Sequence, residues 1–365
     1  MLVRACLFFA LLIPAQGGLE PYSGISFGGK VMSGVFPLRS SGVSTKPVVV
    51  AAEKVLAGLS EDERKAVAFA VEDDHWRQWD NRSGMQKHGL SLYDLSAEKR
   101  ELVLAMLKES LSAKGLERSR NIMRLDETLG ELTGRPAYGE WRYRLSVFGT
   151  PSVTEPWGWQ INGHHLNINY FVLGDQVVMT PTFMGTEPAV ATTGKFAGTK
   201  ALQDEQDRGL AFMRSLPAEL QAKALLSSEK GLTNNVAEAY KDNVNLDFAG
   251  LKASSLNASQ RNALLDLIRE YVGNMRDGHA KVKMSEVEKH LDDTWFAWIG
   301  STAVDGVFYY RIQSPVILIE FDHQQAAALR QNGPTRQHIH TVVRTPNGND
   351  YGKDLLRQHH ELHKH

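Results

Sequence analysis

Helix-forming and strand-forming segments follow one another in blocks along this chain, and their order constrains the fold more than any other feature. Helical periodicity fills residues 97–132, and residues 142–183 are then rich in aromatic and β-branched residues broken by Gly and Pro. Helical spacing returns over residues 201–226 and 258–272, and a second strand block spans residues 294–344. Strict β-α alternation would indicate a parallel sheet, whereas blocks favour the α+β class. We therefore predict a helical N-terminal third packed on a mixed, mainly antiparallel sheet system built from the two strand blocks.

Each strand block is too short to bury both faces of a sheet alone, which predicts a single large α+β domain over residues 47–365. Gly and Ser residues without apolar periodicity predict a flexible lead-in over residues 18–46. Residues 1–17 have the pattern of an export signal: Arg4 precedes a nine-residue apolar stretch, and small residues define a cleavage site after Gly17. We therefore expect a secreted or periplasmic protein after cleavage near Gly17.

The charge balance and the cysteine count exclude several classes of function. The chain has 41 Lys+Arg against 42 Asp+Glu, a net charge of −1. This balance argues against nucleic acid as the main partner, because phosphate binding usually requires a clustered basic face. The single cysteine, Cys6, lies in the export signal, so the mature chain would have no disulfide, thiolate metal ligand or cysteine nucleophile. No later segment offers ~18 uninterrupted apolar residues, so we expect no integral membrane segment in the mature chain.

Polar side chains interrupt three otherwise apolar strand segments, and the first of these is GHHLNINY, which begins at Gly163. On a strand, alternate side chains share a face, so His165, Asn167 and Asn169 would lie on one face. His164 would lie on the other face with the apolar residues, unless a bulge after Gly163 exchanges the two histidines. The sequence therefore offers one histidine of this pair to a functional site and leaves open which one.

The second segment is VILIEFD, in which Glu320 and Asp322 are two positions apart and so share a face of the strand. Two carboxylates side by side repel each other unless a cation or a proton lies between them. The alternative is a strand end at which water solvates both charges. The apolar residues before Glu320 favour burial, and burial would make the pair a candidate for metal binding or acid–base catalysis.

The third segment carries His338 and His340, and this spacing on a strand presents two imidazoles on one face to a transition metal. We predict a metal site formed by these two histidines and Glu320, and catalytic roles for Glu320, Asp322 and His165. All five side chains are expected to converge. Histidines and carboxylates without thiols suit a divalent zinc, manganese, iron or copper ion, and the sequence does not distinguish among them.

Three protein ligands and an open position would activate water, so the leading hypothesis is a metal-dependent hydrolase. With copper or iron, the same ligands would indicate oxidative chemistry instead. The competing class is a non-catalytic exported protein that binds a ligand or a carbohydrate. The chain carries no nucleotide-binding loop and no serine nucleophile elbow, and the sequence does not indicate whether the substrate is a small molecule or a polymer.

Five motifs follow one another along the chain: GHHLNIN, TPTFMGTEP, FAWIGS, YYRIQSPVILIEFDHQ and HIHTVVRTPNGNDYGKDLL. Their order resembles the uncharacterised "domain of unknown function 3500" family of mostly secreted or exported proteins. The resemblance extends from about Val48 to the C-terminus and includes WRYRLSVFGTPS before the GHH motif. It implies a shared fold and export. It implies no activity, because none is established for the family.

Overall fold

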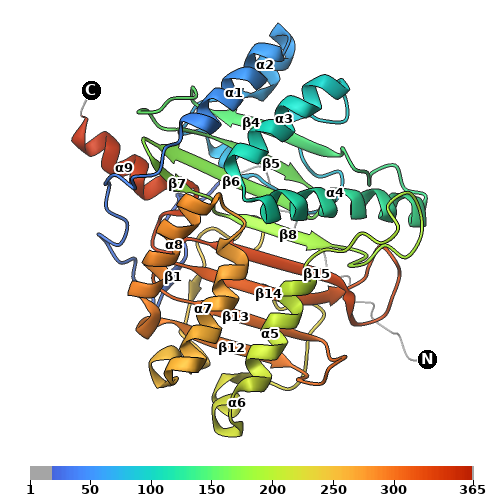
Figure 1. Cartoon of the computed structure of the whole chain (residues 1–365), viewed down its shortest axis with the longest axis vertical. Coiled ribbons are helices and arrows are strands. Elements are labelled where there is room, and N and C mark those ends of the chain that lie inside the picture. The colour runs from blue at the N-terminus through green and yellow to red at the C-terminus, as the bar shows by residue number, and fades with distance from the viewer. Residues whose placement is uncertain (1–18, 364–365) are drawn as a thin grey trace, which may run out of the picture.

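The computed structural model describes residues 19–363, and the predicted export signal lies outside this range. A 13-stranded sheet runs through the molecule, most of its neighbouring strands are antiparallel, and helices lie across it (Figure 1). The predicted α+β class, with a helical N-terminal region packed on a mainly antiparallel sheet, is therefore confirmed. Within residues 19–363, no helix has the length and apolar character that crossing a membrane requires.

Local sequence signals set several helix ends. Ser60 and Glu63 form a capping box, in which each side chain bonds to the backbone N–H of the other residue. Gly134 ends a long helix in the left-handed conformation, with φ 66°. The α-helices described are α1 (Lys46–Gly58), α2 (Glu61–Val67), α3 (Ala97–Ser110), α4 (Ala113–Thr133), α5 (Gln203–Ser215), α6 (Ala218–Ala224), α7 (Ala258–Val272), α8 (Asp277–Lys289) and α9 (Lys353–Leu362).

The main strands follow the two blocks that the sequence predicts, and short strands are added to them. Those up to the end of the first block are β1 (Ser26–Phe27), β2 (Ala68–Phe69), β3 (Leu90–Ser91), β4 (Tyr143–Phe148), β5 (Trp157–Gly163), β6 (Leu166–Leu173), β7 (Gln176–Val178) and β8 (Thr182–Thr186). Those after it are β9 (Leu225–Ser227), β10 (Asn245–Leu246), β11 (Leu251–Lys252), β12 (Trp295–Gly300), β13 (Phe308–Gln313), β14 (Leu318–Gln325) and β15 (Pro334–Arg344). Two of the short strands, β1 and β10, form a separate two-stranded sheet.

The two strand blocks meet where β15 pairs with β8. The order along the sheet is β11-β12-β13-β14-β15-β8-β6-β5-β4-β2, so β15 lies between β14 of its own block and β8 of the first block. Both pairings of β15 are antiparallel, and His340 lies opposite Asp322 on one side and Gly185 on the other. This junction brings together side chains that are far apart in the sequence.

The two faces of the sheet at this junction are covered differently. On one face lie helices: the Nδ2 of Asn274, just after α7, approaches the sulfur of Met184 in β8 at 3.8 Å (Figure 1). On the other face, the ring of Phe183 packs against Trp79 at 6.1 Å and against His340 at 4.9 Å. Two long connections, residues 71–89 and 229–244, reach that second face through Trp79 and Glu238, and we call it the connection face.

Several residues of the predicted flexible lead-in, residues 18–46, contact the body of the protein. Ile25 and Phe36 are buried, and β1 pairs with β10. Asp175, in the turn after β6, accepts hydrogen bonds from residues 40–42. The prediction rested on the Gly and Ser content of the segment, whereas its few apolar side chains anchor it.

Candidate metal centre

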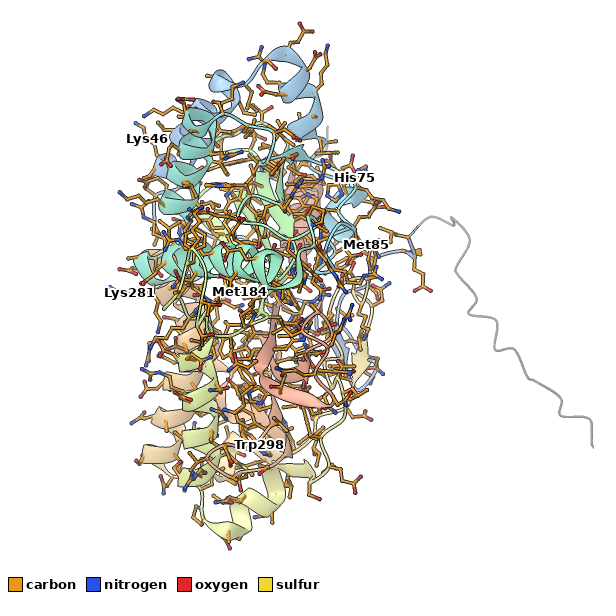
Figure 2. All side chains as sticks on the ribbon, turned by 90° about the vertical axis from the view of Figure 1, so that its right-hand side faces the viewer. Lys46, His75, Met85, Met184, Lys281 and Trp298 are labelled. Carbon is orange, nitrogen blue, oxygen red and sulfur yellow. The ribbon has the colours of Figure 1, made fainter. Side chains whose placement is uncertain are left out.

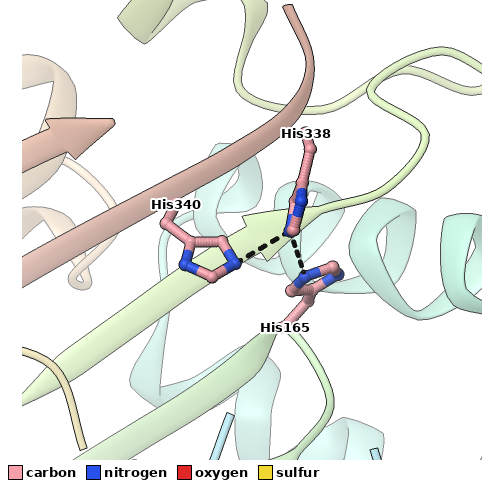
Figure 3. Close-up of side chains that lie close together, drawn as sticks. All are labelled: His165, His338 and His340. Atoms are coloured by element: carbon pink, nitrogen blue, oxygen red, sulfur yellow. Dashed lines mark hydrogen bonds between the residues drawn. The ribbon is translucent and has the colours of Figure 1, made fainter. Parts of the chain in front are cut away.

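Three buried histidines meet at the junction of the two strand blocks (Figure 3). The Nε2 atom of His338 lies 3.1 Å from that of His165 and 3.0 Å from that of His340. One potential ligand atom from each ring lies within 4.8 Å of the others. A tetrahedral ion with ligands at ~2.0–2.1 Å would separate such nitrogens by about 3.3–3.4 Å. The group therefore has nearly the size of a three-histidine metal site.

The alternation of side chains along strand β15 brings two of the three histidines to the same face of the sheet. His338 and His340 are two residues apart on this strand, so both side chains project from the connection face, as predicted. Figure 2 shows how densely side chains fill the molecule on both sides of the sheet. Both histidines are nearly inaccessible, with 8% and 7% of their surface exposed, which excludes the interpretation of two solvated imidazoles.

A tight turn rather than a strand places the third histidine. Gly163 pairs with Leu166, so His164 and His165 form the turn between β5 and β6. The expectation that His165 and the following asparagines share one face of a continuous strand was therefore wrong. His165 has φ 62°, a left-handed conformation that is rare for residues other than glycine, and the turn directs its ring toward β15. His165, not His164, joins the group.

His164 supports the group from outside. Its ring stacks on that of His165 with centroids 3.8 Å apart. Its Nδ1 lies 2.5 Å from a carboxylate oxygen of Asp126 in α4, and Tyr138 packs against its ring. Helix α4 therefore holds the turn that presents His165.

Gly185 on β8 leaves the space that the imidazoles occupy. A Cβ atom at this position would lie 2.9 Å from His165 Cδ2, 3.1 Å from His340 Cδ2 and 3.0 Å from the carbonyl oxygen of Ile339. Real Cβ atoms essentially never approach other atoms within 3.0 Å. The glycine of the TPTFMGTEP motif is therefore a steric requirement of the histidine group.

Hydrogen bonds at the Nδ1 atoms fix the tautomers of two of the rings. His338 Nδ1 lies 2.6 Å from the carbonyl oxygen of Gln325, which can only accept, so this Nδ1 carries the hydrogen. His340 Nδ1 lies 2.8 Å from Oε1 of Glu238. Burial alone would raise the pKa of Glu238, but hydrogen bonds from His340 and Asn235 lower it overall, so the carboxylate is ionised and accepts.

With a hydrogen on each Nδ1 and none on Nε2, the Nε2 atoms of His338 and His340 present lone pairs that repel each other at 3.0 Å. A proton on His338 Nε2 is disfavoured, because burial and the neighbouring imidazoles hold the pKa of His338 well below its ordinary value. Burial does the same to the pKa of His165. A divalent cation relieves the repulsion without protonation, because imidazole nitrogens are common ligands of transition metals. The donor set therefore fits a metal.

Glu320 and Asp322 are buried on the same face, as their spacing predicts, but they do not join the histidine group. Both oxygens of Glu320 accept hydrogen bonds from the backbone N–H groups of residues 236 and 237, at 2.9 Å each. Asp322 lies 2.8 Å from the Nζ of Lys230. Burial raises the pKa of Glu320 to about 7 and also raises that of Asp322. The structure thus brings His165, His338 and His340 together and directs the two acids to residues 230–237.

Two acids near the centre were not selected from the sequence. Glu238, the partner of His340, lies in an irregular connection whose sequence, TNNVAEAY, carries no strand or helix period that indicates its direction. Glu187 follows β8, and its Oε2 lies 3.6 Å from His338 Nδ1. Burial raises the pKa of Glu187. The place of Glu187 within the TPTFMGTEP motif was the one available signal for it.

The fold and the site together define a class: an α+β protein with a long mixed sheet and a buried three-histidine group at its centre. The chain belongs to the family described as "Protein of unknown function (DUF3500)", whose model matches residues 41–353. This confirms the family indicated by the motifs. No curated protein and no solved structure shows significant similarity to the chain.

Proposed function

We propose that the protein is an exported, metal-dependent hydrolase whose metal ion is held by His165, His338 and His340. The observation that carries the proposal is the convergence of three buried imidazoles, in which Nε2 of His338 lies 3.1 Å from that of His165 and 3.0 Å from that of His340. Lone pairs at that distance repel each other, and a divalent cation bound by both nitrogens replaces the repulsion with two coordination bonds.

Three imidazole ligands leave a fourth position exchangeable, which is the arrangement of catalytic rather than structural zinc sites. A divalent ion held in this way lowers the pKa of bound water to ~7 and so supplies a nucleophile for hydrolysis. The contribution of the chain is orientation. The carbonyl oxygen of Gln325 and the carboxylate of Glu238 fix the Nδ1–H tautomers, so both Nε2 atoms offer lone pairs to one point.

Glu320 and Asp322 have a different role in this proposal from the one predicted for them. The oxygens of Glu320 already accept three hydrogen bonds, from two backbone N–H groups and the hydroxyl of Tyr309. Asp322 accepts from two backbone N–H groups and pairs with Lys230. Acids engaged in this way hold neighbouring chain in place, so we assign them to positioning rather than to metal ligation or base catalysis.

Export is part of the proposal and rests on the pattern of residues 1–17, with Arg4, the apolar stretch and the small residues before position 18. The mature chain is expected to begin near Gly18. Mass spectrometry of the protein recovered outside the cytoplasm tests this, and intact protein that keeps residues 1–17 would contradict it.

Metal analysis of the purified full chain tests the site. We expect stoichiometric metal in the wild type, none in His338→Ala, and an unchanged content in His360→Ala, which alters an exposed histidine on α9. Zinc, with hydrolysis of chromogenic esters that His338→Ala abolishes, supports the hydrolase. Stoichiometric copper or iron would replace hydrolysis with oxidative chemistry. A folded wild type that takes up no metal would refute the centre and favour an exported ligand- or carbohydrate-binding protein.

A further inference from the structure

We infer that Glu238 is a positioning residue of the metal centre and that residues 230–242, here called the arm, are anchored to the sheet in order to present it. The inference rests on the proposed function and deepens it. Glu238 Oε1 lies 2.8 Å from His340 Nδ1, and this pairing orients the ring and increases the basicity of its Nε2. Glu238 lies outside every strand and helix, so its position depends on what holds the arm.

The arm first fixes the carboxylate itself. The side-chain amide of Asn235 donates to Oε1 of Glu238 at 2.8 Å, from three residues earlier in the chain. The same oxygen therefore accepts from both Asn235 and His340. These two donors restrict the carboxylate to one orientation, which an acid on an unsupported connection would not keep.

Two acids of β14 then bind the backbone that carries Glu238. Asp322 accepts from the N–H groups of residues 234 and 235, at 2.7 and 3.3 Å. Glu320 accepts from the N–H groups of residues 236 and 237, at 2.9 Å each. Four consecutive N–H groups, directly before Glu238, are thus satisfied by two carboxylates that have 0% of their surface exposed.

A third buried charge, Arg344 of β15, binds the carbonyl groups of the same segment. Its Nε donates to the carbonyl oxygen of Ala237 and its Nη2 to that of Glu238, both at 2.9 Å. Its Nη1 lies 3.0 Å from the carboxylate of Asp242 at the end of the arm. The guanidinium group has 0% of its surface exposed.

Three fully buried ionisable side chains hold the arm, and this arrangement is energetically costly. Removing such groups from water is unfavourable, and apolar residues of similar volume usually give equal or greater stability. These three side chains instead set the orientation of the arm, because they bind both the N–H and the carbonyl groups around Glu238. Thermodynamic linkage makes metal binding and the anchoring of the arm reciprocal. If the arm strengthens metal binding through Glu238, metal binding must stabilise the arm to the same degree.

Competition with a chromophoric chelator, using Zn²⁺ as the probe and the chelator-stripped full chain, tests the inference. We expect a tenfold to hundredfold weaker Zn²⁺ affinity for Glu238→Gln, which keeps an acceptor but loses the charge. Glu238→Ala should bind more weakly still. Glu229→Gln, an exposed acid just before the arm, is the matched control and should bind like the wild type.

Hydrogen exchange provides a second measurement, one that would not depend on Zn²⁺ if Glu238 had a purely structural role. Zn²⁺ should slow exchange at the amides of residues 234–237 in the wild type and have a much smaller effect on them in Glu238→Ala. Equal Zn²⁺ affinity in the wild type and Glu238→Gln would overturn the inference and leave the metal centre intact. A wild type that binds no Zn²⁺ would overturn both. If Glu238→Ala fails to fold, the affinity of Glu238→Gln alone decides.

Discussion

Strand β15 carries two buried polar clusters on its connection face, and they are built in opposite ways. Around Arg344, every group meets its complement: Asp242 lies at 3.0 Å, Asp350 at 3.2 Å, and the hydroxyl of Tyr351 donates to Asp242. Around His338, three groups of the same kind face one another. A cluster whose charges and hydrogen-bonding groups are all paired within it has a structural role. Three imidazoles that face one another through Nε2 atoms can share a cation, which is the physical reason for proposing metal binding at the histidines alone.

The largest expected effect is the loss of unfolding free energy when Arg344 is removed from its cluster. Arg344→Met leaves Asp242 and Asp350 buried without their cation, and removing one partner from such a pair costs about 3–5 kcal/mol. Urea unfolding of the metal-free protein measures this loss. Arg357→Met, which removes exposed ion pairs of α9, is the control and should change the unfolding free energy by ~1 kcal/mol at most. A loss of that small size for Arg344→Met would contradict the comparison.

The second effect is a dependence on pH that originates in Glu320. Its pKa is raised from 4.5 to about 7, so between these values the folded state binds more protons than the unfolded state. Stability from this residue is therefore present below pH ~4.5 and is lost as the pH rises to ~7, by up to about 3 kcal/mol. Urea unfolding at pH 5 and pH 8 should show a smaller difference for Glu320→Gln than for the wild type. An identical difference would contradict the role given to Glu320.

The third effect concerns the space between the rings. Gly185→Ala places a Cβ atom against His165, His340 and the carbonyl of Ile339, which should lower the unfolding free energy by about 1–3 kcal/mol and weaken Zn²⁺ binding. Glu229→Gln, the exposed control used for the arm, should leave both quantities unchanged. Chelator competition and urea unfolding measure both quantities. Unchanged Zn²⁺ affinity would mean that the rings do not need this spacing.

The smallest effect is expected for His338→Gln. In the metal-free protein this change places an amide that can donate toward the Nε2 atoms of His165 and His340, but it also removes the Nδ1–H that donates to the carbonyl oxygen of Gln325. We expect the two effects to offset each other, so that the unfolding free energy changes by no more than about 1 kcal/mol, while metal binding is lost. A clear loss of stability in this variant would show that the opposed rings are not in conflict.

Much of the fold and part of the site followed from sequence patterns with a fixed period. Strand alternation placed His338 with His340, and Glu320 with Asp322, because burial of a sheet face enforces a period of two. The same rule failed at His165, since a two-residue turn interrupts what was expected to be a continuous strand. Strand alternation could not predict the position of Glu238, because the arm has no periodic structure. The course of the arm is set by its contacts with Asp322, Glu320 and Arg344. Partners of buried charges are long-range properties that spacing does not encode.

X-ray absorption spectroscopy of the zinc-loaded full chain tests the central claim most directly. We predict one zinc ion with three imidazole nitrogens and one light exchangeable ligand, all at ~2.0–2.1 Å. His338→Gln, prepared in the same way, should show no stoichiometric zinc. Stoichiometric zinc surrounded by oxygen ligands without imidazole, or a folded wild type that retains no zinc, would contradict the assignment of His165, His338 and His340 as a metal centre.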